Sequence, residues 1–183
     1  MSEKKIVFMS YKEQKEVKPV IEDAITEFLD GDMKRNALDI IAYLRDSKIS
    51  PRWCLTNWWN SSCKGKSICK IHLSDNGWAK TGRSKTYSWH IASYLQYMDK
   101  YKETIMNEGL QNIIWDHFAY WRGCLTRCSN WTTTGRDITI LGKEFKDLCG
   151  CATWRICVHD PDEITLNSVK RLLELEKRAR NEK

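Results

Sequence analysis

The sequence predicts an α+β protein, with an antiparallel β-meander packed with helices, then a Cys-rich C-terminal β module and a terminal helix. Three observations predict this class. Helical and strand-like patterns occupy separate stretches of the chain, residues 69–73 alternate between apolar and polar, and Asn76-Gly77 is typical of a tight hairpin. The chain has 183 residues, 42% of them hydrophobic, which suits a single domain over residues 1–183.

The first fifty residues predict a pair of helices. Apolar residues recur at helical spacing over 20–28, and that segment ends at Gly31. A second amphipathic stripe covers 37–44 and stops before Pro51. The short apolar run over residues 6–9 is interpreted as an edge strand.

The middle of the chain predicts the meander. Residues 53–59 are rich in aromatic residues and threonine, and residues 69–73 present one apolar and one polar face. The hairpin signal at 75–78 leads into a returning strand over 78–81. Residues 89–91 predict a further short strand.

Helical spacing returns over 94–105 and again over 110–121. Two strands are then expected, at 138–141 and 154–158. The final helix is predicted to start with Asp160 as its N-cap, because a proline and a glutamate follow at positions typical of a helix start.

The feature that points to specific chemistry is a cysteine cluster within a Cys-rich subregion, residues 122–160. It consists of two close pairs joined by a longer loop: Cys124, Cys128, Cys149 and Cys151. Each pair can offer two thiolates, and four thiolates complete the tetrahedron that Zn²⁺ prefers. We expect a structural zinc site, because four protein ligands leave no open position for a reactive water.

Other sets of residues could serve the same purpose. Cys157, His159 and His117 are reserve ligands, since three cysteines and one histidine also satisfy Zn²⁺. Two interpretations without a metal stay open, in which the cysteines pair as disulfides or are buried thiols. Buried structural thiols are also expected at Cys69, Cys54 and Cys63.

A second candidate site lies on the predicted sheet, where lysines and arginines outnumber acidic residues between residues 64 and 85. The expected ligand-binding residues are Trp58, Trp59, Trp78, Lys66 and Lys70. Cations beside aromatic rings could hold single-stranded nucleic acid through its phosphates and bases. The same surface could enclose a small anionic or aromatic ligand, or be a solvated polar face opposite a Trp-rich core.

The sequence lacks the motifs that are typical of several functional classes. The chain has no HExxH motif, no GxSxG motif and no phosphate-binding or dinucleotide-binding glycine loop. The apolar run over residues 6–9 is too short for a secretory segment, and no run reaches roughly 18 apolar residues, so a cytoplasmic protein that does not span a membrane is expected. The net charge of +6 is modest.

The expected function is a binding or regulatory domain with a structural zinc site and a small ligand or a protein as its partner. One alternative is an enzyme that uses a cysteine nucleophile. The second alternative is a single-stranded nucleic-acid binder that uses the Trp- and Lys-rich sheet.

Two segments carry a family resemblance. From Trp53 to Thr81, the strand, the Lys-Gly-Lys turn, the alternating strand and the Asn-Gly hairpin resemble uncharacterised bacterial domains of the YdhG-like kind. Residues 135–149, with the Asp-Pro-Asp at 160–162 and the final helix, look like the end of a Cys-bearing family of hypothetical proteins from anaerobic Gram-positive bacteria. The resemblance implies a cytosolic bacterial α+β protein of unknown function, with the four clustered cysteines at the family's cysteine positions.

Overall fold

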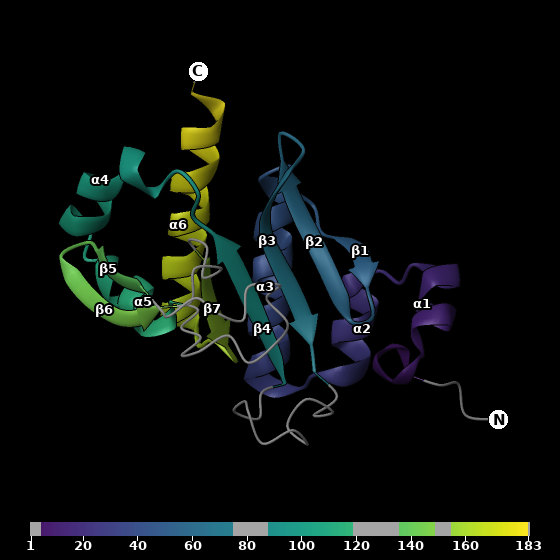
Figure 1. The fold of residues 1–183 in the computed structure, drawn as a ribbon. Coiled ribbons are helices and arrows are strands. Elements are labelled where there is room, and N and C mark those ends of the chain that lie inside the picture. The colour runs from purple at the N-terminus through teal and green to yellow at the C-terminus, as the bar shows by residue number, and fades with distance from the viewer. Residues whose placement is uncertain (1–4, 75–87, 119–135, 149–154, 183) are drawn as a thin grey trace.

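A computed structural model describes residues 5–74, 88–118, 136–148 and 155–182 (Figure 1). The predicted hairpin at 75–78 and its returning strand lie outside these residues. The elements, in chain order, are η1 (Ile6–Phe8), α1 (Tyr11–Val17), α2 (Ile21–Phe28), α3 (Gly31–Asp46), β1 (Arg52–Leu55), β2 (Trp58–Cys63), β3 (Lys66–Leu73), β4 (Trp89–Tyr94), η3 (Met98–Lys100), α4 (Lys102–Asn107), α5 (Gln111–His117), β5 (Arg136–Ile140), β6 (Lys143–Leu148), β7 (Arg155–His159) and α6 (Glu163–Asn181).

The described strands form a five-stranded antiparallel sheet in the order β1-β2-β3-β4-β7, and β5 and β6 form a separate two-stranded sheet. Helices precede and follow the larger sheet, so the predicted α+β class is confirmed. Strand β6 was not expected from the sequence, and it pairs with β5 as a hairpin. None of the described helices has the length and apolar character needed to cross a membrane.

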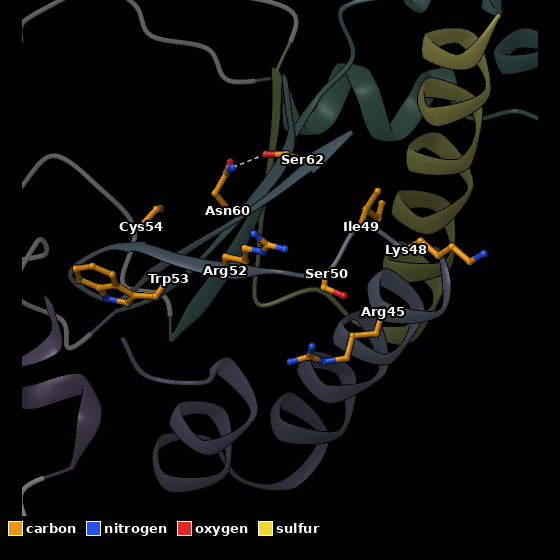
Figure 2. Close-up of a pocket in the computed structure, with 9 residues that line it drawn as sticks. All are labelled: Arg45, Lys48, Ile49, Ser50, Arg52, Trp53, Cys54, Asn60 and Ser62. Carbon is orange, nitrogen blue, oxygen red and sulfur yellow. Dashed lines mark hydrogen bonds between the residues drawn. The ribbon is translucent and has the colours of Figure 1, made fainter. Parts of the chain in front are cut away.

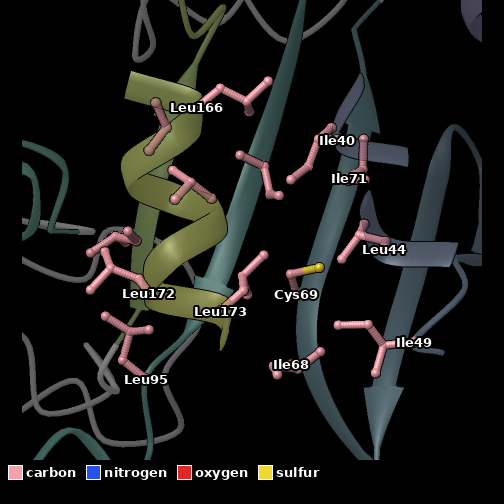
Figure 3. Packing of buried hydrophobic residues seen from close by; sticks show 14 of the residues in the cluster. Ile40, Leu44, Ile49, Ile68, Cys69, Ile71, Leu95, Leu166, Leu172 and Leu173 are labelled. Atoms are coloured by element: carbon pink, nitrogen blue, oxygen red, sulfur yellow. The ribbon is translucent and has the colours of Figure 1, made fainter. Parts of the chain in front are cut away.

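The hydrophobic core lies between one face of the larger sheet and helices α3 and α6, which both run behind the sheet in Figure 1. Alternate residues of each strand point into this layer, because side chains along a strand alternate between its two faces. Figure 3 shows Leu166 and Leu173 of α6, Ile40 and Leu44 of α3, and Cys69 and Ile71 of β3 within this packed layer. Each aliphatic side chain buried in this way contributes about 1.5–3 kcal/mol.

Two of the described hairpins, β2–β3 and β5–β6, are closed by two-residue turns in which both residues have positive φ. Lys64 and Gly65 join β2 to β3, and both have positive φ (50° and 75°). Leu141 and Gly142 join β5 to β6 with φ of 49° and 84°. Positive φ at both central positions matches the right-handed twist of the strands, and this sets the register of each hairpin.

The edge strand predicted over residues 6–9 is wrong. Ile6–Phe8 form a 3₁₀ turn instead, and helix α1 follows at Tyr11. A capping box starts this helix: the Glu13 N–H donates to the Ser10 hydroxyl at 3.3 Å, and the Ser10 N–H donates to the Glu13 carboxylate. The Ser-x-x-Glu pattern at 10–13 was visible in the sequence as a helix start.

The single strand expected over 53–59 is split into β1 and β2 by a tight turn at Asn57, which has a φ of 58°. Asparagine tolerates this left-handed conformation better than most residues. Buried Gln14 from α1 stabilises the turn, because its amide oxygen accepts from the Asn57 N–H at 2.8 Å and from the Trp53 Nε1–H at 3.1 Å. Helix α1 is thereby attached to the start of the sheet.

The final helix starts two residues later than expected. Its N-cap is Asp162, whose carboxylate accepts from the Thr165 N–H at 2.8 Å. Asp160 instead has a positive φ of 41°, and its carboxylate accepts from the backbone N–H groups of Ser88 and Trp89. Asp160 thus joins the end of β7 to the start of β4.

A buried ion pair attaches the C-terminal half of α6 to the sheet. The Arg180 Nε–H donates to the Glu176 carboxylate at 2.7 Å, and its Nη1 donates to the carbonyls of Lys66 and Ser67. Glu176 also accepts from the Tyr101 hydroxyl at 2.7 Å and from the Tyr97 N–H at 3.1 Å. Both charged groups therefore have several polar partners inside the core.

The two helices expected between residues 94 and 121 are shorter than predicted. Tyr94 ends strand β4, and only the short η3 and α4 follow before α5. Helix α5 packs on the small β5–β6 hairpin, where the Trp115 Nε1–H donates to the Ile140 carbonyl at 2.9 Å. Phe118, just after α5, makes an isolated bridge to Ile156 of β7.

Candidate functional site

The predicted zinc ligands fall mostly outside the described residues. Cys124, Cys128, Cys149 and Cys151 all lie in undescribed stretches, as does Trp78. Of the reserve ligands, Cys157 and His159 alternate on β7, and His117 ends helix α5. Within the described ranges, no three His, Cys, Asp or Glu side chains lie close enough together to hold a metal ion.

The described cysteines differ in burial. Cys69 is fully buried, as predicted, and burial raises the pKa of its thiol to about 12. Burial also raises the thiol pKa of Cys157 and of Cys54. Cys63 is buried as expected, whereas Cys54 is exposed on strand β1. A catalytic thiol needs a lowered pKa, so these shifts do not favour Cys54, Cys69 or Cys157 as a nucleophile.

The predicted ligand-binding residues of the sheet point in different directions. Trp59 is only 1% exposed, and its Nε1–H donates to the Pro19 carbonyl at 2.8 Å, so it belongs mainly to the core. Trp58 is half-buried and points to the opposite face. Lys70 lies opposite Asn60 in the register of β2 and β3, and Lys66 is exposed at the start of β3.

Three of the chain's four histidines lie side by side across the larger sheet. His72 of β3 lies opposite His90 of β4, and His90 lies opposite His159 of β7. Trp58 continues the row, because its ring stacks on His72 with centroids 4.3 Å apart and planes 23° apart. We call Trp58, His72, His90 and His159 the histidine row. Ile71 and Leu73 pack into the core, so the row lies on the sheet face away from α3 and α6.

His90, at the centre of the row, is 5% exposed. Burial lowers the pKa of its imidazole to about 2, and the electrostatic influence of His72, His159 and Arg155 acts in the same direction. The centroid of its ring lies 5.3 Å from that of each neighbouring histidine. His90 is therefore uncharged in the folded protein near neutral pH.

A more accessible site lies beside the edge strand β1. Two adjoining openings, with volumes of about 690 and 540 Å³, share the lining residues Arg45, Arg52, Trp53 and Cys54. Lys48 lines the larger opening and Lys18 the smaller one. We call the two openings together the β1 groove. Figure 2 shows Trp53 at one end of the larger opening, with Arg52 at its middle and Arg45 on the α3 side.

The β1 groove is positively charged. Arg45 pairs with Glu22, and this interaction lowers the pKa of the Glu22 carboxyl. Lys18, Lys48 and Arg52 form no ion pair with any described residue. No Asp or Glu is among the described residues that line either opening. The groove thus offers three cations that are available to an external anion.

An aromatic pair adjoins the cations. Tyr11, at the start of α1, stacks on Trp53 with centroids 6.0 Å apart and planes 30° apart. The Tyr11 side is open to solvent, since this residue is 47% exposed. Gln14 accepts from the Trp53 indole N–H, and this hydrogen bond helps to fix the orientation of the ring. The groove therefore combines positive charge with an ordered aromatic surface.

The sequence did not single out the groove, because its residues come from three separate stretches that meet only in the fold. One available signal was the excess of basic residues from Arg45 to Arg52, next to Trp53. The helix-spaced set Tyr11, Lys15 and Lys18 was another, once α1 is recognised as a helix.

Comparison of the chain with protein-family models, with curated proteins and with solved structures gives no match. Function is therefore inferred from the geometry of the β1 groove.

Proposed function

We propose that this protein is a binding domain for a phosphate-bearing anionic ligand, which it holds in the β1 groove. The observation that carries the proposal is the charge of the lining: Lys18, Lys48 and Arg52 line the openings, and none of the described acidic residues does. The overall net charge of +6 favours the approach of an anion in the same sense.

Arg52 is the central contact in this proposal. It stands on β1 between Trp53 and the C-terminal end of α3, and it is exposed. A guanidinium offers a planar set of N–H donors that matches two oxygens of one phosphate. Ser50, Asn60 and Ser62 line the same opening and provide additional polar groups for an oxyanion.

The variant Arg52→Glu will bind inorganic polyphosphate at least about tenfold more weakly than the wild type, because one charge-assisted hydrogen bond contributes about 1.5–3 kcal/mol. Calorimetric titration at low salt measures this change. Binding by the wild type will also weaken as salt is added, since exposed charges are screened.

The matched control is Lys102→Glu, which changes the net charge by the same amount at the exposed start of helix α4. We expect this control to stay within about twofold of the wild type, because it acts only through long-range charge. Equal weakening in the two variants would show a general charge effect and would contradict a site at the β1 groove.

The structural zinc stays a prediction, since all four expected ligands lie outside the described residues. Purified protein is expected to carry about one zinc per chain, and a chelator is expected to lower its Tm. Cys128→Ser should remove the zinc, whereas Cys54→Ser should retain it, because Cys54 lies in the β1 groove. Metal-free wild-type protein with an unchanged Tm in chelator would refute the zinc site.

A further inference from the structure

We infer that the ligand of the β1 groove is single-stranded nucleic acid, with its phosphates along the cations and an unpaired base on the Tyr11–Trp53 pair. This inference rests on the proposed anion-binding function and names the class of ligand. Three features of the described structure carry it: the spread of the cations, the ordered aromatic pair and the composition of one face of α1.

The cations are distributed along the groove. Lys18 follows α1, Arg52 lies on β1, and Arg45 and Lys48 lie at or just after the end of α3. A site for one phosphate would bring its donors to a single point. Charges spread over three elements suit a ligand with a series of phosphates, such as a nucleic-acid backbone.

The aromatic pair is held in place before any ligand arrives. The Trp53 indole donates to Gln14 at 3.1 Å, and the same glutamine oxygen accepts from the Asn57 N–H at 2.8 Å. Trp53 is half-buried, and Tyr11 covers it while remaining exposed to solvent. A fixed aromatic surface loses little freedom when a base stacks on it, which favours binding.

One face of helix α1 extends this surface. Tyr11, Gln14 and Lys15 recur at helical spacing, and Gln14 places that face against β1. Lys18 follows as the C-cap residue of α1 and lines the smaller opening. The Lys15 ammonium lies 6.0 Å from the centre of the Tyr11 ring, and its flexible side chain can turn to a phosphate beside a stacked base. The acidic residues Glu13 and Glu16 do not fall at this spacing.

These features favour a single strand over the other polyanions that a basic groove attracts. An acidic peptide would use the cations but has no flat base to stack on the Tyr11–Trp53 pair. A duplex keeps its bases paired and stacked within itself, so the aromatic pair would not contribute.

The test measures the binding of a fluorescent single-stranded oligothymidylate of about eight nucleotides, a length within the range that such sites cover. An abasic strand of equal length, a duplex and polyglutamate are compared with it. The wild type is expected to bind the oligothymidylate about tenfold more tightly than the abasic strand, because base stacking adds to phosphate contact. Tyr11→Ala should reduce this preference to less than about twofold, and Tyr11→Phe should keep it.

The results of these binding measurements distinguish a failure of the nucleic-acid inference from a failure of the proposed anion-binding function. Equal binding of the oligothymidylate and the abasic strand would overturn the nucleic-acid inference and leave the anion site standing. Polyglutamate or duplex that binds as tightly as the oligothymidylate would also overturn it, in favour of an acidic peptide or paired nucleic acid. Wild-type protein that binds neither polyphosphate nor oligothymidylate would overturn both.

Discussion

Replacement of Glu176 by alanine is expected to destabilise the protein by about 3–5 kcal/mol, because it leaves the Arg180 guanidinium buried without its counter-charge. Glu176 is completely buried and also accepts from Tyr101 and from the Tyr97 N–H. Urea unfolding monitored by tryptophan fluorescence measures the loss, and Tm should fall by roughly 10 °C for a chain of this length.

Two comparisons separate this cost from a general effect of mutating α6. Arg178→Ala removes the exposed partner of Glu174 on the same helix, and it should cost less than about 1 kcal/mol. The double variant Glu176→Leu/Arg180→Met replaces both charges with apolar groups and should recover a large part of the stability. A single-variant loss no greater than that of Arg178→Ala would contradict the assignment of this pair as a buried charge network.

The stability of the protein is expected to fall steeply as the pH drops below about 6.5, with His90 as a principal cause. The folded state holds His90 uncharged, with a pKa of about 2, whereas an unfolded chain binds a proton near pH 6.5. The unfolded state thus binds more protons between these two values, so acid favours unfolding. The free energy of unfolding should decrease by up to about 1.4 kcal/mol per pH unit from this group.

The pH dependence is checked with urea unfolding of the wild type and His90→Asn between pH 7.5 and pH 5. The variant lacks the titrating imidazole, so its stability should change less over this interval even if it is lower at pH 7.5. Identical pH slopes for the two proteins would refute the role assigned to His90.

The parts of the fold that sequence reasoning recovered are those encoded by local pattern. The alternation that ends at Ile71 and Leu73 predicted β3, and the stripe through Ile40 and Leu44 predicted α3. The predicted element boundaries were wrong where a single residue with positive φ decides the local structure. The positive φ of Asn57 divides one aromatic-rich segment into two strands, and the positive φ of Asp160 moves the helix cap to Asp162.

Neither the histidine row nor the β1 groove could be predicted in this way, because each depends on register or packing between distant segments. His90 and His159 are neighbours only because β7 pairs with β4 in one particular register. A shift of one residue would turn His159 to the other face of the sheet. Arg52 and Lys18 line the same opening because Gln14 joins α1 to the β1–β2 turn, and no local sequence pattern encodes that contact.

The position of β7 and α6 in chain order has a consequence for how the protein is made. These two elements come from residues 155–181, yet β7 completes the larger sheet and α6 covers it. During synthesis, Ile71 and Ile91 of the inner strands have no complete apolar cover until this segment has left the ribosome. The core therefore assembles late, through contacts between residues far apart in the chain, which is the slow class of folding reactions and the one most exposed to aggregation.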